Sequence, residues 1–170
     1  METAANEILA KLEQHLRHVD ESALVILKGH LVVEEALSEI IGTFVFHSEQ
    51  LAGARISFAQ KVAIARSMSL DEHNNEMWQL VLAVNSLRNE LAHALDSPKR
   101  VNKTKALIDL HKKLGGAMTT ADGSEVAEHV LLSFAVSYLL GFLSGFIEEV
   151  RRLRSMLHEM DKFVNPHRHK

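Results

Sequence analysis

Apolar residues recur with the 3.6-residue period of an α-helix along most of the 170-residue chain. Runs of β-branched residues are short, and the only two prolines are Pro98 and Pro166. We therefore predict an all-α protein of five to six helices with a long C-terminal helix. The helices are expected over residues 2–18, 20–46, 57–68, about 71–96, 98–114 and 124–164. They form one domain over residues 1–164, and residues 165–170 are predicted to be a flexible tail.

Capping residues mark several of the helix ends. Either Asp20 or Ser22 can cap the second helix, and Ser57 can cap the third. The sequence Asp96-Ser97-Pro98 ends one helix and begins the next, because proline is favoured at the first helical position. Gly115-Gly116 is a C-terminal signal for that next helix.

The second helix has apolar positions that we expect to face the core. These positions are Leu24, Leu27, Leu31, Ala36, Leu37, Ile40, Ile41 and Phe44. Gly29 and Gly42 would weaken an isolated helix, so we interpret them as marks of close packing or of a bend.

The helix over about residues 71–96 combines a packing stripe with a polar face. Its predicted core stripe is Met77, Leu80, Val81, Val84, Leu87, Leu91 and Leu95. Asn85, Asn89 and His93 lie on a neighbouring face, with Trp78, expected to pack in the core or across a dimer seam, on the same side. Arg88 can lean toward that face through its long side chain. One helix thus offers a cation, an amide and an imidazole beside a packing seam.

The sequence R-N-E-L-A-H at Arg88–His93 resembles the R-x4–6-H motif of the HEPN superfamily, in its R-N-x-x-x-H form. The resemblance implies an all-α domain, a homodimer with two facing motifs, and in many members metal-independent endoribonuclease activity in toxins or phage defence. Other members have lost activity or act as binding modules. The resemblance also implies that a carboxylate on an early helix, here Glu34 or Glu35, supports the motif.

Arginine, asparagine and histidine suit RNA cleavage without a metal or cofactor, because the 2′-hydroxyl of the substrate is the nucleophile. His93 would be the general base or acid, since histidine titrates near neutral pH. Arg88 would stabilise charge on the phosphate, and Asn89 would hold the imidazole or a phosphate oxygen, with Asn85 in support. A buried or interface histidine with a purely structural role remains an equal alternative for His93.

Charge is distributed unevenly along the chain, whose formal net charge is −3. Residues 1–95 hold 7 basic and 13 acidic side chains, whereas residues 96–170 hold 12 and 9. Lys99, Arg100 and Lys103 follow the motif directly and could guide an RNA backbone. The alternative is an ordinary solvated helix face.

The last predicted helix contains 18 uncharged residues, Val130–Ile147. That length is at the lower limit for a membrane span. We favour a core helix of a protein with no membrane association, because charged residues follow without a break in the helical pattern. Ser133, Ser137, Gly141 and Gly145 form a stripe of small side chains that would let the second helix or a second subunit approach closely.

Two hypotheses of function follow. The first is a HEPN-type endoribonuclease, a cytoplasmic homodimeric toxin or defence effector restrained by an antitoxin or another protein inhibitor. The second is a catalytically silent helical module that dimerises, binds a protein or regulates transcription. The absence of cysteine and of a signal peptide at the N-terminus favours the cytoplasm.

Overall fold

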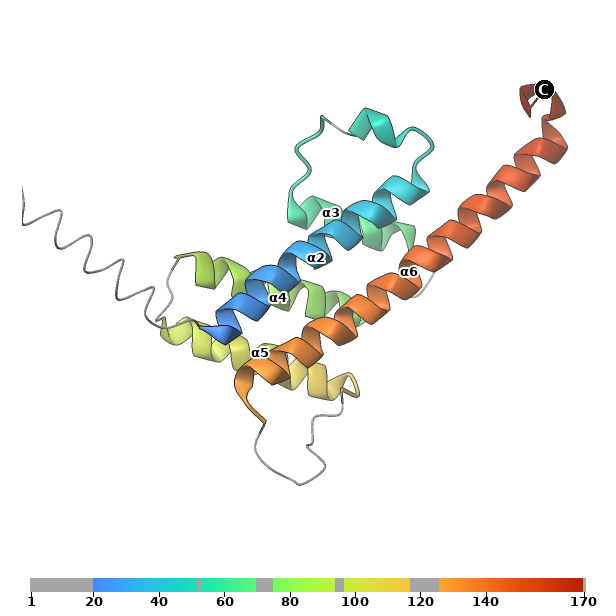
Figure 1. The fold of residues 1–170 in the computed structure, drawn as a ribbon. Helices are drawn as coiled ribbons and strands as arrows, with labels where there is room; N and C mark the ends of the chain where they lie inside the picture. Colours follow the sequence, from blue (N-terminus) through green and yellow to red (C-terminus); the bar gives the residue numbers. More distant parts are fainter. Residues whose placement is uncertain (1–19, 52, 70–74, 94–96, 117–125, 170) are drawn as a thin grey trace, which may run out of the picture.

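A computed structural model describes residues 20–51, 53–69, 75–93, 97–116 and 126–169, with the side chain of His93 left undescribed (Figure 1). These residues form five α-helices and no strand. The helices are α2 (Glu21–Phe44), α3 (Phe58–Met68), α4 (Met77–His93), α5 (Pro98–Lys113) and α6 (Glu128–Val164), with 3-10 turns η1 (Ser48–Leu51) and η2 (Pro166–His169). The all-α class and the long C-terminal helix are confirmed. The helix predicted over residues 2–18 lies outside the described residues.

The capping signals act as predicted. The Asp20 carboxylate accepts a hydrogen bond from the Ala23 amide at 2.9 Å, which identifies Asp20 as the cap of α2. Ser57 and Gln60 form a reciprocal capping box at the start of α3. Ser97 caps α5, which has proline at its first position, and Gly115 follows that helix with φ +89°.

Helices α2 and α6 run side by side in the same direction (Figure 1). Their contact is the most extensive between any two of the described helices. His129 lies 3.1 Å from Glu21 near the start of both helices, and Arg154 donates to the Thr43 carbonyl oxygen at 3.0 Å near the end of α2. Between these points, a Cβ atom added to Gly29 would lie 2.8 Å from a methyl carbon of Val136. The close packing expected at Gly29 is therefore confirmed, and its partner is α6.

The predicted stripe of α4 enters the core. Leu80, Val81 and Val84 are fully buried, and Leu87 and Leu91 nearly so. They share one cluster with apolar side chains of α2, α3, α5 and α6. Trp78 is also buried and packs edge-on against Phe142 and Phe146 of α6. Leu95 lies outside the described residues.

The core face predicted for α2 was partly wrong. Leu24, Leu27 and Leu31 are 43%, 38% and 58% exposed in the single chain. Leu37, Ile40 and Ile41 are buried as predicted, and the rest of the buried face carries Ala23, Ile26, His30 and Val33. Apolar residues occur on both faces of this helix, so periodicity alone did not distinguish the face that meets α3, α4 and α6.

Three members of the small-residue stripe of α6, Ser137, Gly141 and Gly145, are exposed, so α2 does not cover them. No described atom lies within 4 Å of a Cβ atom placed on Gly141 or Gly145. By length and composition α6 could cross a membrane, a test that the core helix of a soluble protein also passes. It contacts α2, α4 and α5, and 39% of its most apolar 18-residue stretch is buried by the described chain.

The C-terminal residues, predicted to form a flexible tail, contain the 3-10 turn η2. Asn165 donates from Nδ2 to Asp161 Oδ1 at 2.7 Å, and His169 Nε2 lies 2.9 Å from Asp161 Oδ2. The turn thus folds back against the last turn of α6.

Replacing Gly29 and Gly42 by alanine should have opposite effects on stability. Alanine is favoured over glycine in a helix by about 1 kcal/mol, so Gly42→Ala, whose Cβ meets no described atom, should raise the free energy of unfolding. Gly29→Ala forces Val136 to move and should lower it by about 1–3 kcal/mol. Urea denaturation measures both, and a Gly29→Ala protein as stable as Gly42→Ala would contradict the close contact.

Candidate functional site

The C-terminal half of α4 carries the Arg88–His93 motif. Leu87 and Leu91, nearly completely buried, anchor this part of the helix in the core. Arg88 is partly buried and Asn89 is exposed, and Arg88 Nη1 donates a hydrogen bond to Asn89 Oδ1 at 3.2 Å. His93 closes the helix, but its side chain lies outside the described residues. The structure therefore joins Arg88 to Asn89 and gives no contact of His93.

A buried histidine of α2 contacts the same helix, α4. His30 of α2 is 4% exposed, and its Nε2 lies 3.0 Å from Asn85 Oδ1 on α4. Because the amide oxygen can only accept, Nε2 carries the hydrogen and donates it. The Phe58 ring of α3 stacks on the imidazole with a centroid distance of 4.5 Å. The predicted supporting residue Asn85 is thus used to hold a histidine from another helix.

Burial lowers the pKa of the His30 imidazole, since a charged ring loses hydration in the core. The hydrogen bond to Asn85 opposes this shift, and the positive charge of Arg88 adds to it. Arg88 is therefore within electrostatic reach of His30. A neutral His30 imidazole therefore adds no positive charge to that of the Arg88 guanidinium.

The two carboxylates predicted to support the motif have different environments. Lys61 of α3 donates from Nζ to Glu34 Oε1 at 2.8 Å, so Glu34 forms an ion pair with α3. The negative charge of Glu34 also acts on His30 and opposes the lowering of its pKa by burial. Glu35 lies on the exposed side of α2. The structure thus brings Glu34 to the region of His30 and leaves Glu35 away from it.

The basic residues predicted to guide RNA lie at the start of α5, and two of them are paired. Lys103 Nζ lies 2.9 Å from Glu90 Oε2 and also donates to the Ser86 carbonyl oxygen at 3.2 Å. Hydrogen bonds from Lys103 and Ser97 hold the pKa of Glu90 below its usual value. Arg100 forms an ion pair with Asp20, whereas Lys99 is exposed. These pairs fasten α5 to α4 and to the start of α2.

Three residues of this region were not among the predicted site residues: His30, Phe58 and Lys61. His30 had a signal in the sequence, because it is a polar residue one helical turn before Glu34 on the same predicted helix. Phe58 and Lys61 belong to another helix and gave no signal. Within the described ranges, no three His, Asp or Glu side chains cluster closely enough to hold a metal ion.

Comparison with known proteins adds no assignment: neither a family model, nor a curated protein, nor a solved structure matches this chain.

Removing the Asn85 amide should destabilise the protein more than removing the Asn89 amide. Asn85→Ala leaves the buried His30 Nε2 without its partner, which costs about 1–3 kcal/mol. Asn89→Ala removes an exposed group on the same helix and should change stability by less than about 0.5 kcal/mol. Urea unfolding of both variants tests this, and equal effects would show that the His30–Asn85 bond contributes little.

Stability should fall as the pH drops below about 6.5, the ordinary pKa of histidine. Burial lowers the pKa of His30 and of His111, so in this range the unfolded chain binds protons that the folded chain does not. The change should be visible between pH 6.5 and 5.5, above the range in which carboxylates titrate. Urea unfolding across this interval and an NMR titration of the His30 ring are the measurements. Constant stability together with a His30 pKa at or above 6.5 would contradict the assignment.

Proposed function

We propose that this protein is a metal-independent endoribonuclease of HEPN type, acting as a toxin or phage-defence effector in the cytoplasm. The observation that carries the proposal is the placement of Arg88 and Asn89. They are hydrogen-bonded to each other on the outer side of α4, while the opposite side of the same turns is buried. His93 follows Asn89 by one helical turn. The resemblance of R-N-E-L-A-H to the HEPN motif supports the same assignment.

In the proposed reaction the 2′-oxygen of a ribose attacks the adjacent phosphorus. The P–O5′ bond breaks, leaving a 2′,3′-cyclic phosphate on one product and a 5′-hydroxyl on the other. His93 takes the proton from the 2′-hydroxyl or gives a proton to the leaving 5′-oxygen. Arg88 donates to the phosphoryl oxygens, where negative charge increases in the transition state. Asn89 orients the guanidinium, to which it is already bonded.

The surroundings of Arg88 support this role. The neutral His30 does not add a second positive charge. Asn85 holds the His30 ring through a hydrogen bond of 3.0 Å between Nε2 and Oδ1. The proposal includes a homodimer, because two facing motifs would supply one histidine as base and the other as acid. A protein inhibitor such as an antitoxin would restrain the activity.

A second candidate is the catalytically silent module that binds a protein or regulates transcription. The observation that favours it is the pairing of Arg100 with Asp20 and of Lys103 with Glu90, which leaves less positive charge for RNA. Exposed apolar side chains on α2 and α6 also suit a binding role.

RNA cleavage by purified protein, freed of any inhibitor and tested with and without chelator, separates the two candidates. His93→Ala should lower the cleavage rate by about 10²–10⁴-fold, as expected for loss of a positioned acid or base. Arg88→Ala should lower it by about 10²–10³-fold, as for loss of a transition-state donor. The products should carry 2′,3′-cyclic or 3′-phosphate ends.

Gln79→Ala is the matched control, because Gln79 is exposed on the same helix, away from the motif. It should leave the cleavage rate unchanged. Full activity in a folded His93→Ala protein would exclude this mechanism. If the wild type cleaves no RNA, the binding-module candidate replaces the nuclease.

A further inference from the structure

The apolar seam of α6 continues beyond the helices that cover it. Its buried positions Leu139, Leu143, Phe146 and Val150 are spaced alternately four and three residues apart. The same alternation continues through Leu153, Leu157, Met160 and Val164. This is the heptad spacing of a helix that packs along its whole length against another helix.

Helix α2 ends before the seam does. Its last residue is Phe44, and Arg154 of α6 donates to the carbonyl oxygens of Thr43 and Phe44 at 3.0 and 3.3 Å. Beyond Arg154, α6 projects past the end of α2 (Figure 1). The seam positions there are exposed: Leu157 is 40%, Met160 57% and Val164 67% exposed.

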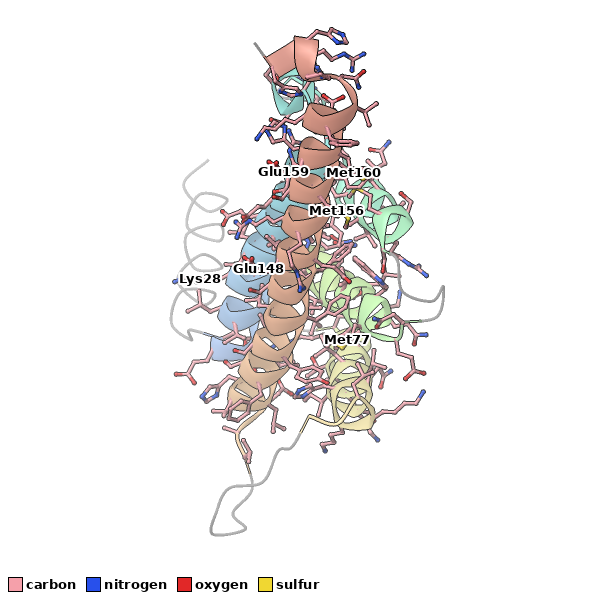
Figure 2. All side chains as sticks on the ribbon, turned by 90° about the vertical axis from the view of Figure 1, so that its right-hand side faces the viewer. Lys28, Met77, Glu148, Met156, Glu159 and Met160 are labelled. Carbon is pink, nitrogen blue, oxygen red and sulfur yellow. The ribbon has the colours of Figure 1, made fainter. Side chains whose placement is uncertain are left out.

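Two more apolar residues flank these positions. Met156 is 57% and Phe163 88% exposed, and each directly precedes a seam position. Figure 2 shows Met156 and Met160 on one flank of the projecting part of α6, and Glu159 on the other. We call Met156, Leu157, Met160, Phe163 and Val164 the end stripe.

We propose that the end stripe binds the end stripe of a second copy of this chain, with the two α6 ends antiparallel about a two-fold axis. In that alignment Leu157 lies opposite Met160 of the second copy, and Leu153 lies opposite its Val164. Each pair occurs twice, as the two-fold axis requires. The pairing continues the seam by which α6 already packs on α2.

The flanking positions also match in this alignment. Met156 faces Phe163 of the second copy on one side of the seam, so apolar meets apolar. On the other side Arg154 faces Asp161 of the second copy, so opposite charges meet. Both charged groups already have partners within the chain, so the proposal needs only that they do not repel. One short stretch is thus complementary to itself, which identifies the occupant as another copy.

The interface goes beyond the proposed nuclease activity. The end stripe lies past the end of α2, whereas His30, whose pKa the charge of Arg88 lowers, lies in the middle of that helix. RNA cleavage and association through α6 are therefore independent measurements.

Light scattering at micromolar concentration tests the association. We expect the wild type to have at least twice the mass of the chain, and the double variant Leu157→Glu, Met160→Glu to have half the wild-type mass. Ser155→Glu, on the exposed opposite side of the same turns, is the matched control and should keep the wild-type mass. Circular dichroism checks that the variants remain folded. A wild-type monomer, or a folded double variant of wild-type mass, would overturn the proposal.

Single cysteines test the antiparallel direction, because the chain contains no cysteine of its own. A mixture of Leu157→Cys and Met160→Cys proteins, one with a tag that changes its size, should form a mixed disulfide dimer on oxidation. Each variant alone should form much less. Dimers that form equally well in each variant alone would indicate parallel helices and overturn the alignment.

Discussion

The contact between α2 and α6 at Gly29 and Val136 is the constraint on which the arrangement of the helices depends. A Cβ atom at this position would be too close to Val136, so glycine lets the two helices approach more closely than another residue would. Side chains turn by about 100° per residue, so directing Gly29 toward α6 also sets the direction of His30. It faces α3 and α4, where Phe58 and Asn85 hold it. Packing against the longest helix thereby orients the histidine behind the candidate site.

Much of this fold could be predicted from local signals. The first residues of α2, α3 and α5 follow from the N-caps Asp20, Ser57 and Ser97 and from Pro98, because capping depends on residues within one turn. The α4 stripe could be predicted because its large aliphatic residues, apart from the exposed Leu82, lie on one side. The buried side of α2 could not, because Leu24, Leu27 and Leu31 form an equally apolar stripe on the other side. Periodicity detects a stripe but does not say what will cover it.

The candidate site was predictable to the extent that it lies on one helix. Asn85 and Asn89 share a face of α4 because they are four residues apart, and Arg88 reaches Asn89 through its long side chain. The bond from His30 to Asn85 joins residues 55 positions apart, and the pair Lys61–Glu34 joins residues 27 apart. Such contacts depend on how separate helices pack, which a single sequence does not encode in any local pattern. Glu34 therefore could be identified as a residue of interest, but its partner could not.

The carboxylates beside the basic run of α5 change what its charges can contribute to binding a polyanion. A cation that gives up a carboxylate for a phosphate exchanges one ion pair for another, so little attraction is gained. In water, much of the affinity for nucleic acid comes from counterions that leave the polymer as its phosphates are neutralised. Arg100 and Lys103 would neutralise a bound phosphate less completely, because the negative charges of Asp20 and Glu90 remain beside them. A nucleic acid bound here would therefore be held mainly by groups placed for its shape and its reacting phosphate, and only weakly by the general field of the protein.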